Sequence, residues 1–223
     1  MKKSISLVVG GTSGIGKDIS YILKKNGERV ITLSRKNYNN KNHITFDILN
    51  DEIEILKKKV KWKIKNLIFA QRYRGSDANN HYKISAEWPS NFIKKFQKKI
   101  EKKGSIVFLG SVASDFYIKE QDDCYHGSRG AIKSLVKYFC SVLGKDKIRV
   151  NSVSPDFVIK NENKNFFKKN KKFIKKIEKK IPLKRVGTAR DVSNLVSFLC
   201  SDKSTFITGQ NINVDGGLTV PRN

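Results

Sequence analysis

The chain has 223 residues, the size of one large α/β domain. Hydrophobic residues make up 38% of it, which is enough for a sizeable core and excludes a disordered or collagen-like chain. Three widely spaced cysteines, Cys124, Cys140 and Cys200, suit reduced thiols rather than disulfides or a zinc site. No apolar run approaches the roughly 20 residues that a membrane-spanning helix needs. We therefore expect a cytoplasmic protein with no membrane span and no metal ligands.

The charge is strongly positive: 46 Lys and Arg stand against 20 Asp and Glu, a net charge of +26. A balance of this kind favours nucleic-acid or membrane partners. However, 37 of the basic residues are Lys and nine are Arg, and nucleic-acid binders usually need Arg for bidentate contacts. The excess is either a product of AT-rich coding or an attraction for an acidic partner. We do not expect a nucleic-acid partner.

Apolar runs typical of strands alternate with helical patterns from start to finish. Strands are predicted at residues 4–9, 29–34, 44–48, 66–70, 104–109, 148–153 and 210–214. Helices are predicted over residues 15–26, 49–61, 125–143 and 189–199, the last opened by a capping box at Thr188 and Asp191. The alternation predicts a single-domain Rossmann fold over residues 1–223, a doubly wound parallel sheet flanked by helices.

One insertion stands out. Residues 160–180 contain ten Lys, and between them lie apolar residues three, four and seven positions apart: Phe166, Phe167, Phe173, Ile174 and Ile177. This spacing predicts a basic amphipathic helix or helix pair. It is a lid over a cleft, a docking face for a membrane or an acidic protein, or a core-facing helix with a solvated Lys face.

A glycine-rich stretch lies between the first predicted strand and the first predicted helix. Gly10 would allow the tight turn, Gly14 would let the backbone approach a diphosphate, and Gly16 would let the helix pack on the strand. The N–H groups and the dipole of the helix N-terminus favour phosphate there. The stretch therefore predicts a dinucleotide site.

The end of the second predicted strand bears on the choice of cofactor. A NAD site usually has Asp or Glu there, on the ribose hydroxyls, but this chain has Ser34 and Arg35. No carboxylate competes with a 2′-phosphate, and Arg35 can pair with one. We expect NADP(H) rather than NAD(H); the alternative is that Arg35 is one of many surface cations.

Further motifs extend the pattern along the chain. They are Asp47 after the third strand, Gly110-Ser111-Val112 after the fifth, Tyr125-His126-Gly127-Ser128-Arg129, Arg149-Val150-Asn151-Ser152-Val153-Ser154-Pro155-Asp156, and residues 182–217. With the glycines, they make the chain resemble the short-chain dehydrogenase/reductase family over essentially its whole length. Within that family it resembles the 3-oxoacyl-carrier-protein reductases, with Arg129 where the family's Y-x-x-x-K has Lys.

The resemblance implies hydride transfer between NADP(H) and a carbonyl or alcohol substrate. Tyr125 would be the general acid or base, Ser111 would hold the substrate oxygen, and Arg129 would supply the cation that a phenol with a pKa of about 10 needs. Arg129 lies four residues on, hence on the same helix face. The resemblance also implies a wider set of cofactor-binding residues: Gly10, Thr12, Ser13, Gly14, Ile15, Gly16, Ser34, Arg35, Asp47, Ile48, Ala70, Tyr125, Arg129 and Val158. A homodimer or homotetramer is implied as well, and the basic surface suits an anionic or carrier-bound substrate.

Departures from the family pattern support a second hypothesis. Arg129 cannot relay a proton as Lys can, Asp156 replaces a Gly, and the family's helix Asn has Ser85 as its nearest match. The alternative is a catalytically impaired nucleotide-binding homologue that acts as a sensor or scaffold. In that case Ser111 is a turn residue and Tyr125 a helix-start aromatic. Arg129 then forms an ion pair with one of three carboxylates: Asp122, Asp123 or Asp156.

Overall fold

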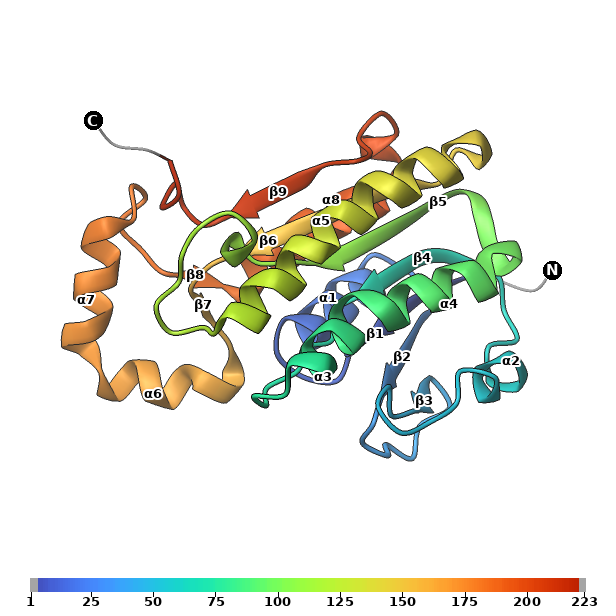
Figure 1. The fold of residues 1–223 in the computed structure, drawn as a ribbon, viewed down its shortest axis with the longest axis horizontal. Helices are drawn as coiled ribbons and strands as arrows, with labels where there is room; N and C mark the ends of the chain where they lie inside the picture. Colours follow the sequence, from blue (N-terminus) through green and yellow to red (C-terminus); the bar gives the residue numbers. More distant parts are fainter. Residues whose placement is uncertain (1–3, 221–223) are drawn as a thin grey trace.

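A computed structural model describes residues 4–220 and arranges them in three layers (Figure 1). The central layer is a seven-stranded sheet in which every hydrogen-bonded pair is parallel. In spatial order its strands are β3 (His43–Thr45), β2 (Val30–Ser34), β1 (Ile5–Val9), β4 (Ile64–Phe69), β5 (Ile100–Leu109), β6 (Arg149–Pro155) and β9 (Asn211–Val214). The prediction of a single-domain, doubly wound Rossmann fold is confirmed.

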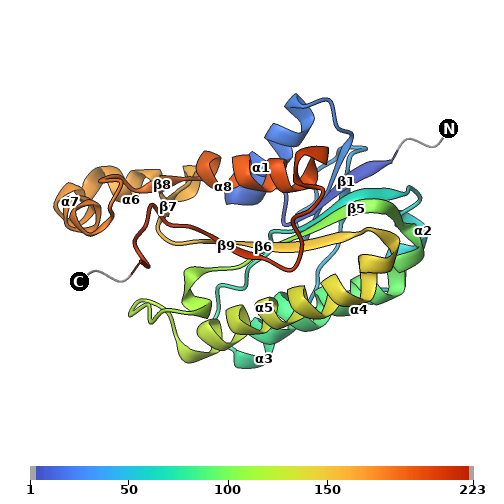
Figure 2. The same ribbon diagram turned by 90° about the horizontal axis from the view of Figure 1, so that it is seen from above.

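Helices cover both faces of the sheet, as Figure 2 shows from above. On one face lie α1 (Gly14–Lys25) and α8 (Ala189–Cys200). On the other lie α3 (Ala78–Tyr82), α4 (Trp88–Phe96) and α5 (Asp123–Leu143). A short helix, α2 (Ile55–Lys59), precedes β4, and a second small sheet pairs β7 (Val158–Ile159) with β8 (Gly187–Thr188).

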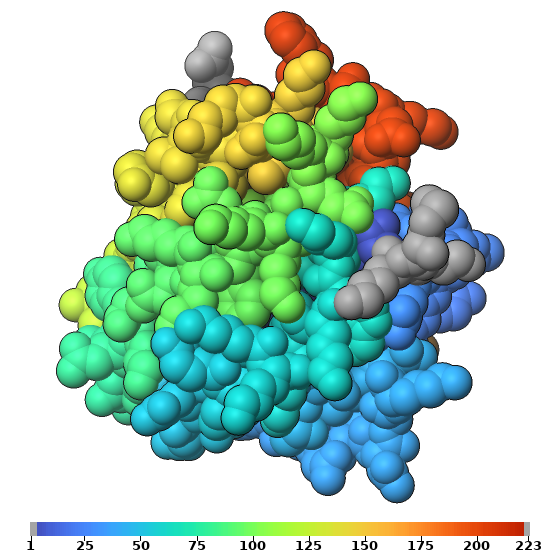
Figure 3. Space-filling view, turned by 90° about the vertical axis from the view of Figure 1, so that its right-hand side faces the viewer, coloured from blue at the N-terminus to red at the C-terminus, as the bar shows by residue number. Residues whose placement is uncertain are grey.

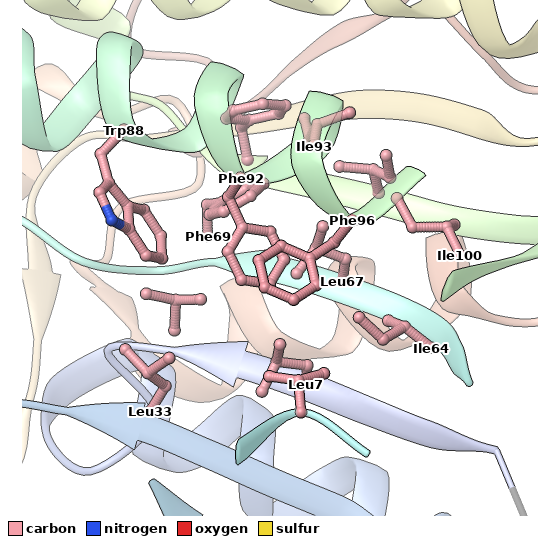
Figure 4. Packing of buried hydrophobic residues seen from close by; sticks show 14 of the residues in the cluster. Leu7, Leu33, Ile64, Leu67, Phe69, Trp88, Phe92, Ile93, Phe96 and Ile100 are labelled. Atoms are coloured by element: carbon pink, nitrogen blue, oxygen red, sulfur yellow. The ribbon is translucent and has the colours of Figure 1, made fainter. Parts of the chain in front are cut away.

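Two hydrophobic cores, one on each face, hold the layers together. The first packs α4 and α5 on the sheet, and Figure 4 shows Phe92, Ile93 and Phe96 of α4 lying over Leu67 and Phe69 of β4. The second packs α1 and α8 on the opposite face. Strands buried on both faces read as continuous apolar runs, which is why the sequence located most of them.

Local capping sets several helix starts. The predicted capping box at Thr188 is present: its Oγ1 accepts from the N–H of Asp191 at 3.3 Å, and the Asp191 carboxylate accepts from the N–H of Thr188 at 2.8 Å. Asp122 caps α5 by accepting from the N–H of Tyr125 at 2.6 Å. These caps satisfy N–H groups that the first helical turn leaves unpaired.

Two local predictions differ from the structure. The helix expected over residues 49–61 is confined to Ile55–Lys59, because the Asp47 carboxylate accepts from the N–H of Leu49 and the side-chain amide of Asn50 and holds a turn there. No helix is predicted between β4 and β5. The structure has α3, a π-helical turn at Lys83–Glu87 and α4 there.

The helix pair at residues 160–180 extends beyond the carboxyl ends of the strands (Figures 1 and 2). It consists of α6 (Lys164–Lys169) and α7 (Lys171–Lys180), as the apolar spacing predicted. Phe167 is buried and packs with Phe157, while Phe166 and Phe173 stay exposed. Among the described residues, none from α6 or α7 belongs to either core, so the pair does not face the main core.

Parallel strands bring all of their carboxyl ends to one edge. The strand order reverses between β1 and β4, so the loops after these two strands diverge and leave a crevice at that edge. Figure 3 views the opposite end of the molecule, where the segment around α2 and the start of β5 lie at the surface. The fold therefore places this crevice, where a ligand would bind, beside the α6–α7 helix pair.

The core of the α4 face gives a stability prediction. Phe92 is fully buried and stacks on Phe96 with ring centroids 4.4 Å apart. Phe92→Ala removes this contact and leaves a cavity, so we expect a loss of about 3–5 kcal/mol in the free energy of unfolding. The matched control is Phe206→Ala at a fully exposed ring, with a change within about 0.5 kcal/mol. Urea denaturation measures both, and equal losses would contradict this packing.

Candidate active site

A cavity of about 420 Å³ opens at the carboxyl ends of β1, β2, β4 and β5. Its walls include nearly all of the predicted site residues: Gly10, Thr12, Ser13, Gly14, Ile15, Ser34, Arg35, Asp47, Ile48, Ala70, Ser111, Tyr125, Arg129 and Val158. Gly16 is buried beneath the loop instead of lining the cavity. Positions spread over nearly 150 residues thus meet in one place.

The glycine loop leaves no room for side chains at two positions. Gly10 has a φ of +76°, and a Cβ there would lie 2.7 Å from the backbone nitrogen of Gln71. A Cβ on Gly16 would lie 2.2 Å from the carbonyl oxygen of Gly10. The start of α1 therefore rests directly on the end of β1, and its N–H groups point toward the cavity edge.

The second strand supplies the wall beside this loop. Thr12 Oγ1 donates to Ser34 Oγ at 3.1 Å and ties the loop to the end of β2. Arg35 follows in the cavity wall, exposed, and among the described residues it has no hydrogen-bond or ion-pair partner. Its guanidinium is thus available to an anion in the cavity.

Two guanidinium groups lie over the Tyr125 ring. The Arg129 Cζ is 4.7 Å from the centre of the Tyr125 ring, and the Arg72 Cζ is 4.8 Å from it. Arg129 shares the α5 face with Tyr125, while Arg72 follows β4 and donates to the side-chain oxygen of Gln121 at 2.9 Å. Positive charge is attracted to an aromatic face, so both contacts fix the ring.

Arg129 is 2% exposed and donates to the carbonyl oxygen of Leu109 at 3.3 Å. Its Nε and Nη2 have no hydrogen-bond partner among the described residues. Burial lowers the pKa of the guanidinium, yet Arg stays protonated in proteins. No carboxylate of the described chain pairs with it, so the alternative ion pair with Asp122, Asp123 or Asp156 is not formed.

Ser111 and Asp156 line the same cavity. Ser111 is buried at the end of β5, and its Oγ accepts from the N–H of Ala113 at 3.2 Å, which makes it a cap as well as a cavity residue. Burial raises the pKa of the Asp156 carboxyl, with the nearby charges of Asp215 and Glu120 adding to it. Its Oδ2 has no partner among the described residues.

Sequence reasoning missed several cavity neighbours. Lys160 lines the cavity, and Glu162 beside it accepts from the N–H of Gly14 at 2.6 Å. His81 is buried next to Tyr125, with ring centroids 6.1 Å apart, and bonds the carbonyl oxygen of Gly75 at 3.0 Å. No local pattern identifies these residues, because their neighbours come from distant parts of the chain.

Two other site classes find no support in residues 4–220. No helix in that range has the length and apolarity to cross a bilayer. Within the same range, His, Cys, Asp and Glu side chains nowhere gather in a group of three or more that could hold a metal ion.

Comparison with known proteins decides the family. Residues 65–219 match the family model described as enoyl-(acyl carrier protein) reductase. The 3-oxoacyl-(acyl-carrier-protein) reductase FabG of Buchnera aphidicola is 33% identical over an alignment of 247 positions that covers 98% of each chain. The chain belongs to the short-chain dehydrogenase/reductase family. Members of this family are oxidoreductases, and the resemblance seen in the sequence is confirmed at that level.

Two further relatives extend the comparison. A tropinone reductase homolog of Arabidopsis thaliana is 43% identical over 117 residues, which is 52% of this chain and 42% of the relative, so the chain matches less than half of that protein's length. The structure of 4-hydroxyisoleucine dehydrogenase complexed with NADH superposes with a TM-score of 0.87 at 27% identity, covering 99% of this chain and all of that one.

Two features of the cavity fit a bound dinucleotide. A Cβ on Gly14 would lie 3.5 Å from the side chain of the cavity residue Lys160, and an anionic side chain already lies on the N–H of Gly14. Moreover, the buried Arg129 has two donor atoms without partners at the cavity wall. Both features are those of a site for phosphate and hydroxyl groups.

Two glycine variants test the close contact between the glycine loop and the start of α1. Gly16→Ala pushes a methyl group into the carbonyl of Gly10, so we expect a loss of about 1–3 kcal/mol in stability. Gly130→Ala on α5 meets no atom within 4 Å and is expected to gain about 0.5–1 kcal/mol, because Gly is a poor helix former. Thermal unfolding compares them. An unchanged melting temperature in Gly16→Ala would contradict the close contact.

Proposed function

We propose that this protein transfers a hydride between NADP(H) and a carbonyl or alcohol substrate, with Tyr125 as general acid or base. The observation that carries the proposal is the position of Tyr125, in the cavity wall and in contact with two arginines. Membership of the short-chain dehydrogenase/reductase family supports it. The NADH complex of the 27% identical dehydrogenase supports a nicotinamide cofactor.

The cofactor residues follow from the cavity walls. The glycine loop would hold the diphosphate, Asp47 and Ile48 would lie against the adenine, and Arg129 would reach a ribose hydroxyl with its partnerless donors. A bound reduced nicotinamide supplies the hydride that reduces the substrate carbonyl. Side chains of this protein would bind the substrate and supply the proton.

Tyr125 donates its hydroxyl proton to the substrate oxygen as that oxygen becomes an alkoxide. Among the described residues the Tyr125 hydroxyl has no hydrogen-bond partner, so it is available to a substrate. The charges of Arg129 and Arg72 stabilise the negative charge that remains on the phenol oxygen. Ser111 holds the substrate oxygen by a hydrogen bond. The reverse reaction uses the same groups in the opposite sense.

Removal of the Tyr125 hydroxyl is the direct test of this mechanism. In Tyr125→Phe the ring keeps its contacts with the two arginines, but no proton can be donated. We expect kcat to fall roughly a hundredfold to ten-thousandfold while the variant still binds NADPH. The matched control is Tyr138→Phe, an exposed ring on the same helix, with full activity. NADPH oxidation with a panel of carbonyl compounds measures both.

Full activity in Tyr125→Phe would reject the mechanism. A wild-type protein that binds NADPH but turns over no carbonyl compound would favour the second candidate, a nucleotide-binding sensor or scaffold. The observations behind that candidate are the buried Arg129 in place of Lys and the acidic Asp156 in the cavity wall.

The preference for NADP(H) over NAD(H) is a separate part of the proposal, supported by the partnerless Arg35 at the end of β2. Arg35→Gln removes the charge that would pair with the 2′-phosphate. We expect NADPH to bind about tenfold more weakly and NADH to bind unchanged. Lys41→Gln, outside the cavity, is the control. Fluorescence titration of the nicotinamide decides it, and equal losses for both cofactors would contradict the assignment.

The remaining expectations stay predictions. They are a cytoplasmic location, a homodimer or homotetramer, a lid role for residues 160–180, and a substrate that is anionic or bound to an acidic carrier. The cations around the cavity support an anionic substrate. Full-length similarity to a carrier-protein reductase supports a carrier-bound one.

A further inference from the structure

Glu162 lies against the loop that would bind the cofactor's diphosphate. The N–H of Gly14 donates to Glu162 Oε1 at 2.6 Å, across 148 positions of sequence. Gly14 is the first residue of α1, whose first turn has no acidic residue and whose N-cap Ser13 makes no side-chain cap bond. Glu162 therefore supplies the negative charge that the N-terminus of this 12-residue helix favours.

The turn that carries Glu162 is built by its neighbours. Asn163 accepts from the N–H of Lys160 at 2.6 Å and donates to the carbonyl oxygen of Val158 at 3.1 Å. This turn, Asn161–Asn163, leads directly into α6. The contact with Gly14 thus joins the α6–α7 pair to the glycine loop.

Positive charge surrounds the contact. Lys160 and Arg74 both line the cavity next to Gly14. Burial acts to raise the pKa of the Glu162 carboxyl. Backbone hydrogen bonds, including that from Gly14, and the charges of Lys160 and Arg74 outweigh burial, so the pKa lies below its usual value and the group is ionised near neutral pH. Burial and the charges of Arg72 and Arg74 lower the pKa of Lys160. These cations repel one another, and an anion among them relieves that repulsion.

We propose that Glu162 is an internal substitute for the diphosphate, which must displace it from Gly14 to bind among Arg74, Lys160 and the glycine loop. One N–H cannot serve two anions, and two anions that close repel each other. Displacement frees the turn before α6, so cofactor binding releases residues 160–180 from the loop. This inference rests on the proposed dinucleotide binding and adds Arg74 and Lys160 to the binding residues.

The test compares two variants that each remove one negative charge from the same segment. Glu162→Gln removes the ionised competitor, and we expect about tenfold tighter binding of both NADPH and NADH, by titration of nicotinamide fluorescence. Glu178→Gln on α7 makes the same charge change away from Gly14, and we expect unchanged affinity. Unchanged affinity in Glu162→Gln, or equal tightening in both variants, overturns the proposal.

Trypsin gives a second readout that does not depend on affinity. We expect NADPH to speed cleavage after the lysines of residues 164–180 in the wild type, and a Glu162→Ala variant, which has no acceptor for the N–H of Gly14, to be cleaved at that rate without cofactor. If NADPH binds but leaves wild-type cleavage unchanged, the release is overturned. If wild type binds neither NADPH nor NADH, the proposed function fails instead, so the two failures are distinct.

Discussion

The close contact between the start of α1 and the ends of β1 and β4 determines the geometry of the site. Gly10 and Gly16 have no space for a Cβ, so the helix N-terminus reaches the point where the strand order reverses. The loops after β2 and β4 then close around it and bring Arg35 and Arg72 to the cavity.

The cavity has a higher proportion of Arg among its basic residues than the chain as a whole. The chain has nine Arg and 37 Lys, yet Arg35, Arg72, Arg74 and Arg129 all line the cavity, where the lysines among residues 4–220 are Lys36 and Lys160. Most of the lysine excess therefore lies elsewhere. Planar guanidinium groups can both stack on rings and bind anions in fixed geometry, and two of them, Arg72 and Arg129, lie over the Tyr125 ring. The carboxylate of Glu162 accepts from the N–H of Gly14 and places a negative charge near two of these cations, Arg74 and Lys160.

Local patterns predicted the fold because each lies within a short stretch of sequence. Buried strands are apolar runs, the glycine loop lies between a strand and a helix, and Tyr125 and Arg129 are one helical turn apart. They failed where partners are distant. The stacking of Arg72 on Tyr125 and the bond from Gly14 to Glu162 depend on how β4 and the turn before α6 meet the loop, which no local spacing encodes. The helix expected over residues 49–61 was too long, because Asp47 holds the start of that segment as a turn.

The reaction proposed for this cavity is hydride transfer from a nicotinamide to a carbonyl carbon, with Tyr125 supplying the proton. The most direct measurement uses NADPH deuterated at the transferring C4 position and a panel of ketones, keto acids and ketoacyl thioesters, with product analysis by mass spectrometry. We expect one deuterium on the carbinol carbon of a product alcohol, and roughly a hundredfold to ten-thousandfold slower formation of that product when Phe replaces Tyr125. Cofactor that binds the protein but delivers no deuterium to any member of the panel would contradict it.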